Sequence, residues 1–290
     1  MRIGFIGGGK VGRSFGKYLV DNGFNVMGYY SRSYSSAVAS ANYTDSKPFE
    51  MLHQLIDTVG IIFVTTPDDA LQSICNEISN TRKLRRDHLL VHMSGAHSSE
   101  VFNNAKKFGC SIYSLHPLQA FANIDVAVEN LKNTVFSIEG DEENLDKLVN
   151  IMKLCGNQYF ILDGKNKPLY HAAACVVSNY LVTLMDLSIK MLKAADINEI
   201  EGFKAMYPLI IGSLNNVKDF GTVEALTGPI ARGDVNTIRK HLDVMKVKAP
   251  NEALFYKRLG EETTKLANEK KLKDKKIVDC LNTLWKEEII

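Results

Sequence analysis

This sequence has few cysteines, and no two of them stand in a C-x-x-C spacing. The five are odd in number and scattered along the chain, at Cys75, Cys110, Cys155, Cys175 and Cys280. That distribution argues against a disulfide framework and against a zinc site. We therefore expect reduced thiols, no metal and a cytoplasmic location.

Excess charge and long apolar runs are also missing. The 290 residues carry 35 Lys and Arg against 33 Asp and Glu, a net charge of +2, which is too balanced for a dedicated polyanion binder. The best apolar stretch, 172–185, falls short of the ~18–20 residues of a membrane span and contains Asn179. Residues 1–6 lead into a glycine-rich turn rather than the apolar core of a secretory leader. We expect a soluble protein with no nucleic-acid or membrane partner.

Short apolar runs alternate with helical stretches over the first 160 residues. Most runs have five to seven residues and several are β-branched, as in buried parallel strands. Helical periodicity lies between them, for example at 10–22 and 141–154. This alternation predicts an α/β fold with a doubly wound Rossmann sheet. The expected strands are Arg2–Ile6, Asn25–Tyr30, Val59–Thr65, His88–His92, Ser111–Leu115, Thr134–Ile138 and Gln158–Leu162.

The pattern changes after Gly164. From there to the end, helical periodicity runs nearly throughout and no alternating strand is evident. The sequence therefore predicts a dinucleotide-binding Rossmann domain over 1–163 and an all-helical domain of five or six helices over 164–290. We expect the helical domain to contribute to substrate binding and dimerisation.

A G-x-G-x-x-G motif follows the first expected strand and opens the first expected helix. In this context Gly7 permits a tight turn, Gly9 permits close approach of a pyrophosphate, and Gly12 permits close helix–strand packing. Lys10 and Val11 begin the helix, whose free N–H groups and positive dipole end favour phosphates. The motif predicts a dinucleotide site; the alternative is a glycine turn without a ligand.

The end of the second expected strand lacks the acid that binds the ribose of NAD. Ser31, Arg32 and Ser33 stand there instead. Two hydroxyls and a guanidinium suit a 2′-phosphate, so we expect NADP(H) rather than NAD(H). The alternative is that Arg32 is an ordinary exposed loop residue.

Two further strand ends should border the cofactor, because ligands of such sheets bind at the carboxyl ends of the strands. Thr65, Thr66 and Pro67 follow one of these strands, and Ser94 and Gly95 follow the next. We expect Ser94 and Gly95 near the nicotinamide. Pro, Ser and Gly also favour ordinary turns, which is the alternative interpretation.

Two of the seven histidines stand out as candidate catalytic residues. His116 precedes Pro117 at the ligand edge of the sheet, and His171 begins the first long helix of the second half. Cys175 and Asn179 follow His171 at i+4 and i+8, on the same helix face. We assign His171 as general acid/base, with His116 and Asn179 beside the substrate. The alternative is that these are satisfied packing residues.

A turn-rich segment over 226–234 contains Arg232, which could clamp a substrate carboxylate. A plain turn between helices is the alternative. With Ser94 and Asn179, Arg232 completes the candidate substrate-binding residues.

Four strings together resemble the 6-phosphogluconate-dehydrogenase-like superfamily, and within it the group with a Rossmann-like domain followed by a C-terminal domain of unknown function. Relatives include pyrroline-5-carboxylate reductase, prephenate dehydrogenase and ketopantoate reductase. The prephenate enzymes have a similar His-Pro at the strand end, and ketopantoate reductases begin the equivalent helix with a lysine where this chain has His171. The strings are Ser114–Gln119, Tyr170–Ala174, Ser178–Leu181 and Leu226–Asp234.

The resemblance implies an NADPH-dependent oxidoreductase that reduces a C=O or C=N bond of a small metabolite. Ketopantoate, a 2-oxo acid, is one substrate the helix comparison suggests. Related members dimerise through the helical domain, so a homodimer is expected. A non-catalytic NADP(H) sensor is the alternative from another class, and a flavin- or deazaflavin-coupled enzyme is a third interpretation.

Overall fold

The chain divides into two compact units, Met1–Ser178 and Asn179–Ile290. We describe a computed structural model that covers residues 1–287. The last strand ends at Ile161, and in the described residues that follow all regular structure is helical. The α/β class with an N-terminal Rossmann sheet and a helical C-terminal region is thus confirmed.

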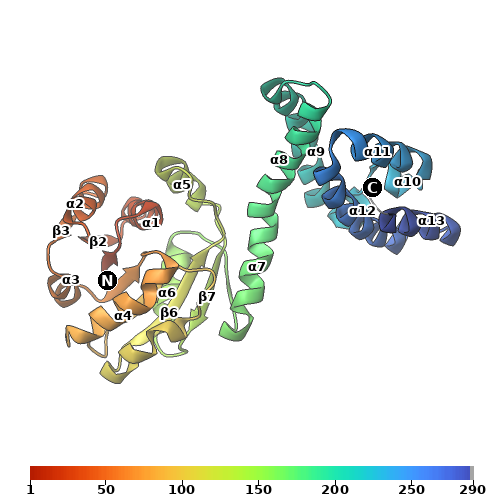
Figure 1. Ribbon diagram of the computed structural model, residues 1–290. Coiled ribbons are helices and arrows are strands. Elements are labelled where there is room, and N and C mark those ends of the chain that lie inside the picture. Colours follow the sequence, from red (N-terminus) through yellow and green to blue (C-terminus); the bar gives the residue numbers. More distant parts are fainter. Residues whose placement is uncertain (288–290) are drawn as a thin grey trace. The chain divides into compact units, whose positions relative to one another are not determined.

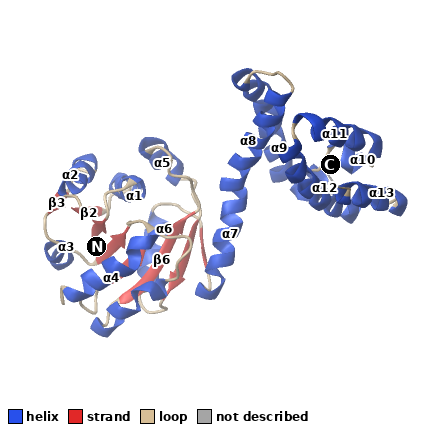
Figure 2. Cartoon of the chain, viewed as in Figure 1, coloured by secondary structure: helices blue, strands red, loops and turns tan. Residues whose placement is uncertain are grey.

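The first unit is built on one eight-stranded sheet, drawn in red in Figure 2. Its order is β3-β2-β1-β4-β5-β6-β7-β8, and all neighbours are parallel except β6 and β7. The strands are β1 (Arg2–Ile6), β2 (Asn25–Tyr30), β3 (Lys47–Phe49), β4 (Ile61–Val64), β5 (Leu89–His92), β6 (Ser111–Pro117), β7 (Phe136–Gly140) and β8 (Tyr159–Ile161).

Helices cover both faces of this sheet (Figure 1). On one face, α1 (Lys10–Asp21), α2 (Tyr34–Tyr43), α5 (Ile124–Leu131) and α6 (Leu145–Leu154) pack on the strands around Phe5, Phe15 and Phe63. On the other face, α3 (Leu52–Thr58), α4 (Leu71–Asn80) and the 3-10 helix η2 (Ser99–Phe108) do the same around Leu55 and Phe102. A layer of buried apolar side chains on each face therefore holds the strands, and with them their carboxyl ends, in place.

All seven expected strands are present, and the sequence missed β3. That strand is three residues long, contains Pro48 and pairs only with β2 at the edge of the sheet. A proline lacks the N–H that a central strand needs, so such a segment gives almost no strand signal. α6 begins at Leu145, later than the periodicity from Asp141 suggested.

The helix that carries His171 starts earlier and ends sooner than expected. The short 3-10 helix η3 (Gly164–Asn166) leads into α7 (Lys167–Val177), with His171 in its middle rather than at its start. A single turn residue, Ser178, whose N–H still donates to Ala174 O, then separates α7 from the next helix. α7 belongs to the same compact unit as the sheet, Met1–Ser178.

Six helices make up the described part of the second unit, and residues 164–287 hold seven α-helices with α7, not five or six. Ile238, Leu242, Leu281 and Trp285 form its small core. The six helices are α8 (Asn179–Ala194), α9 (Glu199–Ala225), α10 (Gly228–Arg232), α11 (Val235–Lys248), α12 (Pro250–Lys270) and α13 (Lys275–Lys286).

One helical stretch, Gly164–Ala194, is long and apolar enough to cross a membrane by length and composition alone. The expectation that no stretch reaches that length is therefore wrong. None of the residues in its most apolar window is buried within the chain. Length and composition alone do not show a membrane span; the finding marks an apolar surface that the described chain leaves unburied.

Candidate active site

The glycine turn has the geometry that its motif predicts. Gly7 has φ +110°, and a Cβ there would come within 2.9 Å of the Thr65 carbonyl oxygen. A Cβ on Gly12 would run into Thr65 Oγ1 and approach Gly7 O to 2.7 Å. A Cβ on Gly9 would meet no atom within 4 Å. Two of the glycines therefore close the turn against β4, while Gly9 faces open space in which phosphates fit.

Gly8 is required as well, and the sequence motif did not assign it. Its Cβ would lie 2.6 Å from Ser40 Oγ and 2.7 Å from Ser36 O on α2. Arg13 Nε donates to the Gly8 carbonyl at 2.9 Å and to Ser40 Oγ at 3.1 Å. The only sequence signal was the unbroken run of three glycines.

A cavity of about 1190 Å³ lies along the carboxyl ends of four adjacent strands, β2, β1, β4 and β5. Neighbouring strands are ~4.8 Å apart, so three such steps give roughly 15 Å, enough for an extended dinucleotide. Ten predicted residues line it: Gly7, Gly9, Lys10, Val11, Ser31, Arg32, Thr65, Thr66, Pro67 and Ser94. Gly12, Ser33 and Gly95 are not among the lining residues.

Lining residues that the sequence did not single out lie at both ends of the cavity. Tyr30, Ser36 and Glu77 join Arg32 at the β2 end, where the Tyr30 hydroxyl donates to Glu77 Oε1 at 3.0 Å. Met93 and Phe121 join Ser94 at the β5 end. Lys10 Nζ donates to the carbonyl of Ala122 at 2.6 Å, which ties the start of α1 to the loop before α5.

The turn after β5 is fixed by its own hydrogen bonds. Ser94 Oγ accepts from the backbone N–H groups of Ala96 and His97 at 3.1 and 3.2 Å. His92 Nδ1 accepts from the Ser94 N–H at 3.2 Å, and His92 Nε2 donates to the Ser98 carbonyl at 3.1 Å. Burial lowers the pKa of His92 to about 3, with the charge of Lys167 adding to the effect. An uncharged His92 therefore supports the turn.

The two predicted catalytic histidines meet at Gly95. A Cβ on Gly95 would lie 2.5 Å from His171 Nδ1 and 2.7 Å from His116 Nε2. The two imidazole rings are 5.9 Å apart, centre to centre, and nearly perpendicular. Glycine is therefore the residue that lets both rings approach the end of the cofactor cavity.

Each imidazole has a partner on α7. The Tyr170 hydroxyl lies 2.7 Å from His116 Nδ1, and burial raises the pKa of Tyr170. Burial, with the charge of Lys167, lowers the pKa of His116 to about 4, so His116 is uncharged near neutral pH. Tyr170 can then donate to Nδ1 and leave the proton of His116 on Nε2.

Within residues 1–287, the hydrogen bonding of His171 leaves a buried imidazole nitrogen without a partner. Its Nε2 lies 3.7 Å from Cys175 Sγ, as the i+4 spacing predicted. Its Nδ1 is buried and has no hydrogen-bond partner in the described part of the chain. A buried polar atom without a partner is costly, so this nitrogen is suited to a ligand atom at Gly95.

Lys167, at the start of α7, is a buried group that the sequence did not suggest. The side chain is 0% exposed, and its Nζ donates to Ser114 Oγ. Burial lowers its pKa to about 8, against the opposing influence of the charges on Glu139 and Asp68. Lysines are almost never fully buried unless paired, and no motif marks this one.

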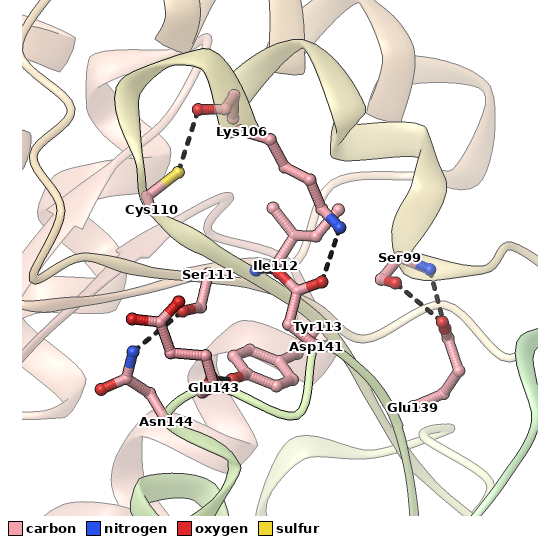
Figure 3. Close-up of polar contacts among 11 residues, drawn as sticks. Ser99, Lys106, Cys110, Ser111, Ile112, Tyr113, Glu139, Asp141, Glu143 and Asn144 are labelled. Atoms are coloured by element: carbon pink, nitrogen blue, oxygen red, sulfur yellow. Dashed lines mark hydrogen bonds and ion pairs between the residues drawn. The ribbon is translucent and has the colours of Figure 1, made fainter.

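Glu139, on β7, is one of the two carboxylates whose charge acts on this lysine. It lies opposite Ser114 in the β6–β7 pair. Its carboxylate accepts from both the N–H and the hydroxyl of Ser99 at 2.7 Å, as Figure 3 shows. These bonds join the start of η2 to the sheet.

Two predicted substrate residues lie in the second unit. Asn179 is the first residue of α8 and Arg232 the last of α10, and both are exposed there. Their roles remain predictions. Within residues 1–287, no group of three or more His, Cys, Asp or Glu side chains is placed to hold a metal.

The chain combines two known domain families. Residues 1–117 match the family described as a Rossmann-like domain, and residues 134–263 match the domain of unknown function DUF2520. The resemblance drawn from the sequence, to a Rossmann-like domain followed by a C-terminal domain of unknown function, is confirmed. A comparison with curated proteins finds no match.

Solved structures share the fold along nearly their whole length. A Bacteroides fragilis protein described as a candidate NADP oxidoreductase is 22% identical, with TM-score 0.72, over 91% of this chain and 98% of that one. A Thermotoga maritima protein is 27% identical, with TM-score 0.69, over 92% and 97%. An imine reductase from Myxococcus stipitatus in complex with NADP+ is 15% identical, with TM-score 0.63, over 99% and 100%.

Proposed function

We propose that this protein is an NADP(H)-dependent reductase that acts on a C=N or C=O bond of a small metabolite. The observation that carries the proposal is the position of two imidazoles where the dinucleotide cavity ends. His116 and His171 both approach Gly95, next to the cavity residue Ser94. Hydride transfer to a double bond needs a proton for the second atom, and these side chains can supply it.

The other end of the cavity supports NADP(H). Ser31, Arg32 and Ser36 line it, and these groups can bind a 2′-phosphate by charge-assisted hydrogen bonds. The start of α1 and the open space at Gly9 suit the pyrophosphate. The imine reductase from Myxococcus stipitatus, which shares the fold of this chain, was solved with NADP+, and this also supports NADP(H) as the cofactor.

The cofactor supplies a hydride from its nicotinamide. His171 is the candidate proton donor, because its buried Nδ1 is unpartnered and faces Gly95. His116 stays uncharged and, with Tyr170 on Nδ1, can direct its Nε2–H at the substrate.

For the substrate, we favour a C=N bond over a 2-oxo acid such as ketopantoate. The ketopantoate suggestion depended on His171 and Asn179 lying along one helix, and one turn residue, Ser178, stands between α7 and α8 there. The likeness to an imine reductase favours cyclic imines. Arg232 and Asn179 remain candidates for substrate contacts.

The test combines binding with turnover on the full chain. NADPH and NADH are first titrated by fluorescence, and NADPH consumption is then followed with a panel of cyclic imines and 2-oxo acids that includes ketopantoate. We expect tighter binding of NADPH and turnover of at least one imine. NADPH binding without turnover of any panel member would instead support a non-catalytic NADP(H) sensor, and binding of neither cofactor would contradict both.

We further propose that the protein works in the cytoplasm as a homodimer through its second unit. Apolar side chains on α8 and α9 are exposed, among them Val182 at 69% and Leu209 at 67%. Gly202 is the only buried residue of α9 within the described chain. Contiguous exposed apolar side chains of this kind mark surfaces that bind a partner. A second copy of the chain offers the same apolar helices.

A further inference from the structure

Lys167 is an ammonium group buried behind the candidate site without touching the cavity. It is 0% exposed, is not among the cavity-lining residues, and donates to a neutral hydroxyl, Ser114 Oγ. Burying a charge costs several kcal/mol unless it is compensated. A lysine at this place therefore needs a reason other than stability.

Ser114 connects this lysine to the turn at the site. The Ser114 hydroxyl donates to the carbonyl of Ser94 at 3.2 Å. A chain of two hydrogen bonds thus runs from Lys167 through Ser114 to the residue before Gly95. Ser114 and His116 are two residues apart on β6, so their side chains point to the same face of the sheet.

The charged and titratable groups that act on Lys167 or feel its charge come from four elements, β5, β6, β7 and the 3-10 helix η1 (Asp68–Ala70). Glu139 on β7 and Asp68 on η1 favour the protonated lysine. Both oxygens of Glu139 accept from Ser99, and among the described residues Lys167 donates to Ser114 rather than forming an ion pair with this carboxylate. On the other side, its charge lowers the pKa of His92 on β5 and of His116 on β6, and Tyr170 and His171 on α7 contact His116.

We propose that Lys167 is a positioning residue of the candidate active site. Through Ser114 it holds the Ser94–Gly95 turn against the two imidazoles, and it places a positive charge on the buried side of the site. Only the expected effect on turnover rests on the proposed reductase function. The effects on the turn and on His116 can be measured without a substrate.

The charge effect follows from elementary electrostatics. A cation close to an imidazole disfavours a second positive charge, and partial burial weakens the screening by water. The lowered pKa of His116 has Lys167 as its second cause, after burial. Removing the lysine charge should therefore let His116 take up a proton closer to neutral pH.

The experiment compares three variants of the full chain with the wild type. Lys167→Met removes the charge and keeps a side chain of similar length, Ser114→Ala breaks the hydrogen-bond chain but keeps the charge, and Lys165→Met is the matched control at an exposed lysine two residues away. Histidine ring signals are followed by NMR between pH 5 and 8, with the His116 signal assigned from a His116→Asn spectrum. Amide hydrogen exchange at Gly95 reports on the turn.

We expect His116 not to titrate in this range in the wild type or in Lys165→Met, and to begin to titrate at its acid end in Lys167→Met, still below the ordinary value of about 6.5 because burial remains. In Ser114→Ala, His116 should stay uncharged while exchange at Gly95 becomes faster. Once a substrate is known, Lys167→Met should lower kcat about tenfold to a hundredfold and change KM little.

A folded Lys167→Met protein whose His116 still does not titrate would overturn the charge effect. Unchanged exchange at Gly95 in Ser114→Ala would overturn the positioning effect, and this variant decides the matter if Lys167→Met does not fold. Failure of every substrate, with these NMR changes present, would count against the reductase function and leave this inference standing.

Discussion

His171 Nδ1 lies 2.5 Å from the point that a Cβ atom would occupy on Gly95. The same point is 2.7 Å from His116 Nε2. A single methyl group at this position would thus push against both imidazoles at once. The first prediction follows directly from this contact.

Gly95→Ala should lower kcat by about a hundredfold, because displacing catalytic groups by ~1 Å can have an effect of that size. Its NADPH dissociation constant should change little, since Gly95 does not line the cavity. Steady-state kinetics and a fluorescence titration measure the two quantities. Gly60→Ala is the control, because a Cβ there meets only Arg2 O, at 4.0 Å. Equal losses of activity in both variants would contradict the role of Gly95.

Arg32→Ala should weaken NADPH binding by about 10–100-fold, the effect of losing a hydrogen bond to a charged group. NADH, which lacks the 2′-phosphate, should bind almost as before. Parallel titrations with the two cofactors measure this difference. Arg86→Ala, at an exposed arginine far along the sequence, should leave both affinities unchanged. An equal loss for NADH and NADPH would show that Arg32 does not read the phosphate.

Lys167→Met should raise the free energy of unfolding at pH 7 by about 1–3 kcal/mol, because a buried charge is replaced by an apolar side chain. The pKa of Lys167 falls from 10.5 to about 8 on folding. The unfolded chain therefore binds more protons between pH 8 and 10.5, and wild-type stability gains from Lys167 deprotonation as the pH rises through this window.

The advantage of Lys167→Met over the wild type should accordingly shrink from pH 8 toward pH 10. Urea unfolding at pH 7, 8.5 and 10 measures it, with Lys165→Met as the exposed control. A difference that does not depend on pH would mean that the lysine is not buried in its charged form.

Val182→Glu should convert a dimer into a monomer, because it places a charge on an exposed apolar surface of α8. Light scattering at micromolar concentration reports the mass. Lys193→Glu, at an exposed lysine of the same helix, introduces the same side chain and should leave the mass unchanged. A monomeric wild type would contradict the proposed dimer before any variant is made.

The sequence was most informative where local patterns decide the structure. The apolar runs marked seven of eight strands, and the glycine motif marked the turn whose dihedral angles and close contacts need it. β3 escaped because a three-residue edge strand with Pro48 has no apolar periodicity. Such a strand forms because β2 offers it a free edge, which is tertiary information.

The candidate site was predictable only in part for a similar reason. His116 and His171 could be picked out as polar residues at a strand end and on an apolar helix. Their meeting at Gly95 depends on how β5, β6 and α7 pack, and no spacing in the sequence encodes that. The burial of Lys167 could not be predicted, because a lysine at the start of a helix is expected to be exposed to solvent.

The assignment of α7 to the unit that ends at Ser178 has an evolutionary consequence. Under the proposed function, the cofactor-binding residues and the two candidate proton donors, His116 and His171, are inherited together on one contiguous stretch of chain. If Asn179 and Arg232 contact the substrate as predicted, changes there would alter substrate choice without altering the residues of the chemical step. Related proteins would then differ in their substrates and share the residues that carry out the reduction.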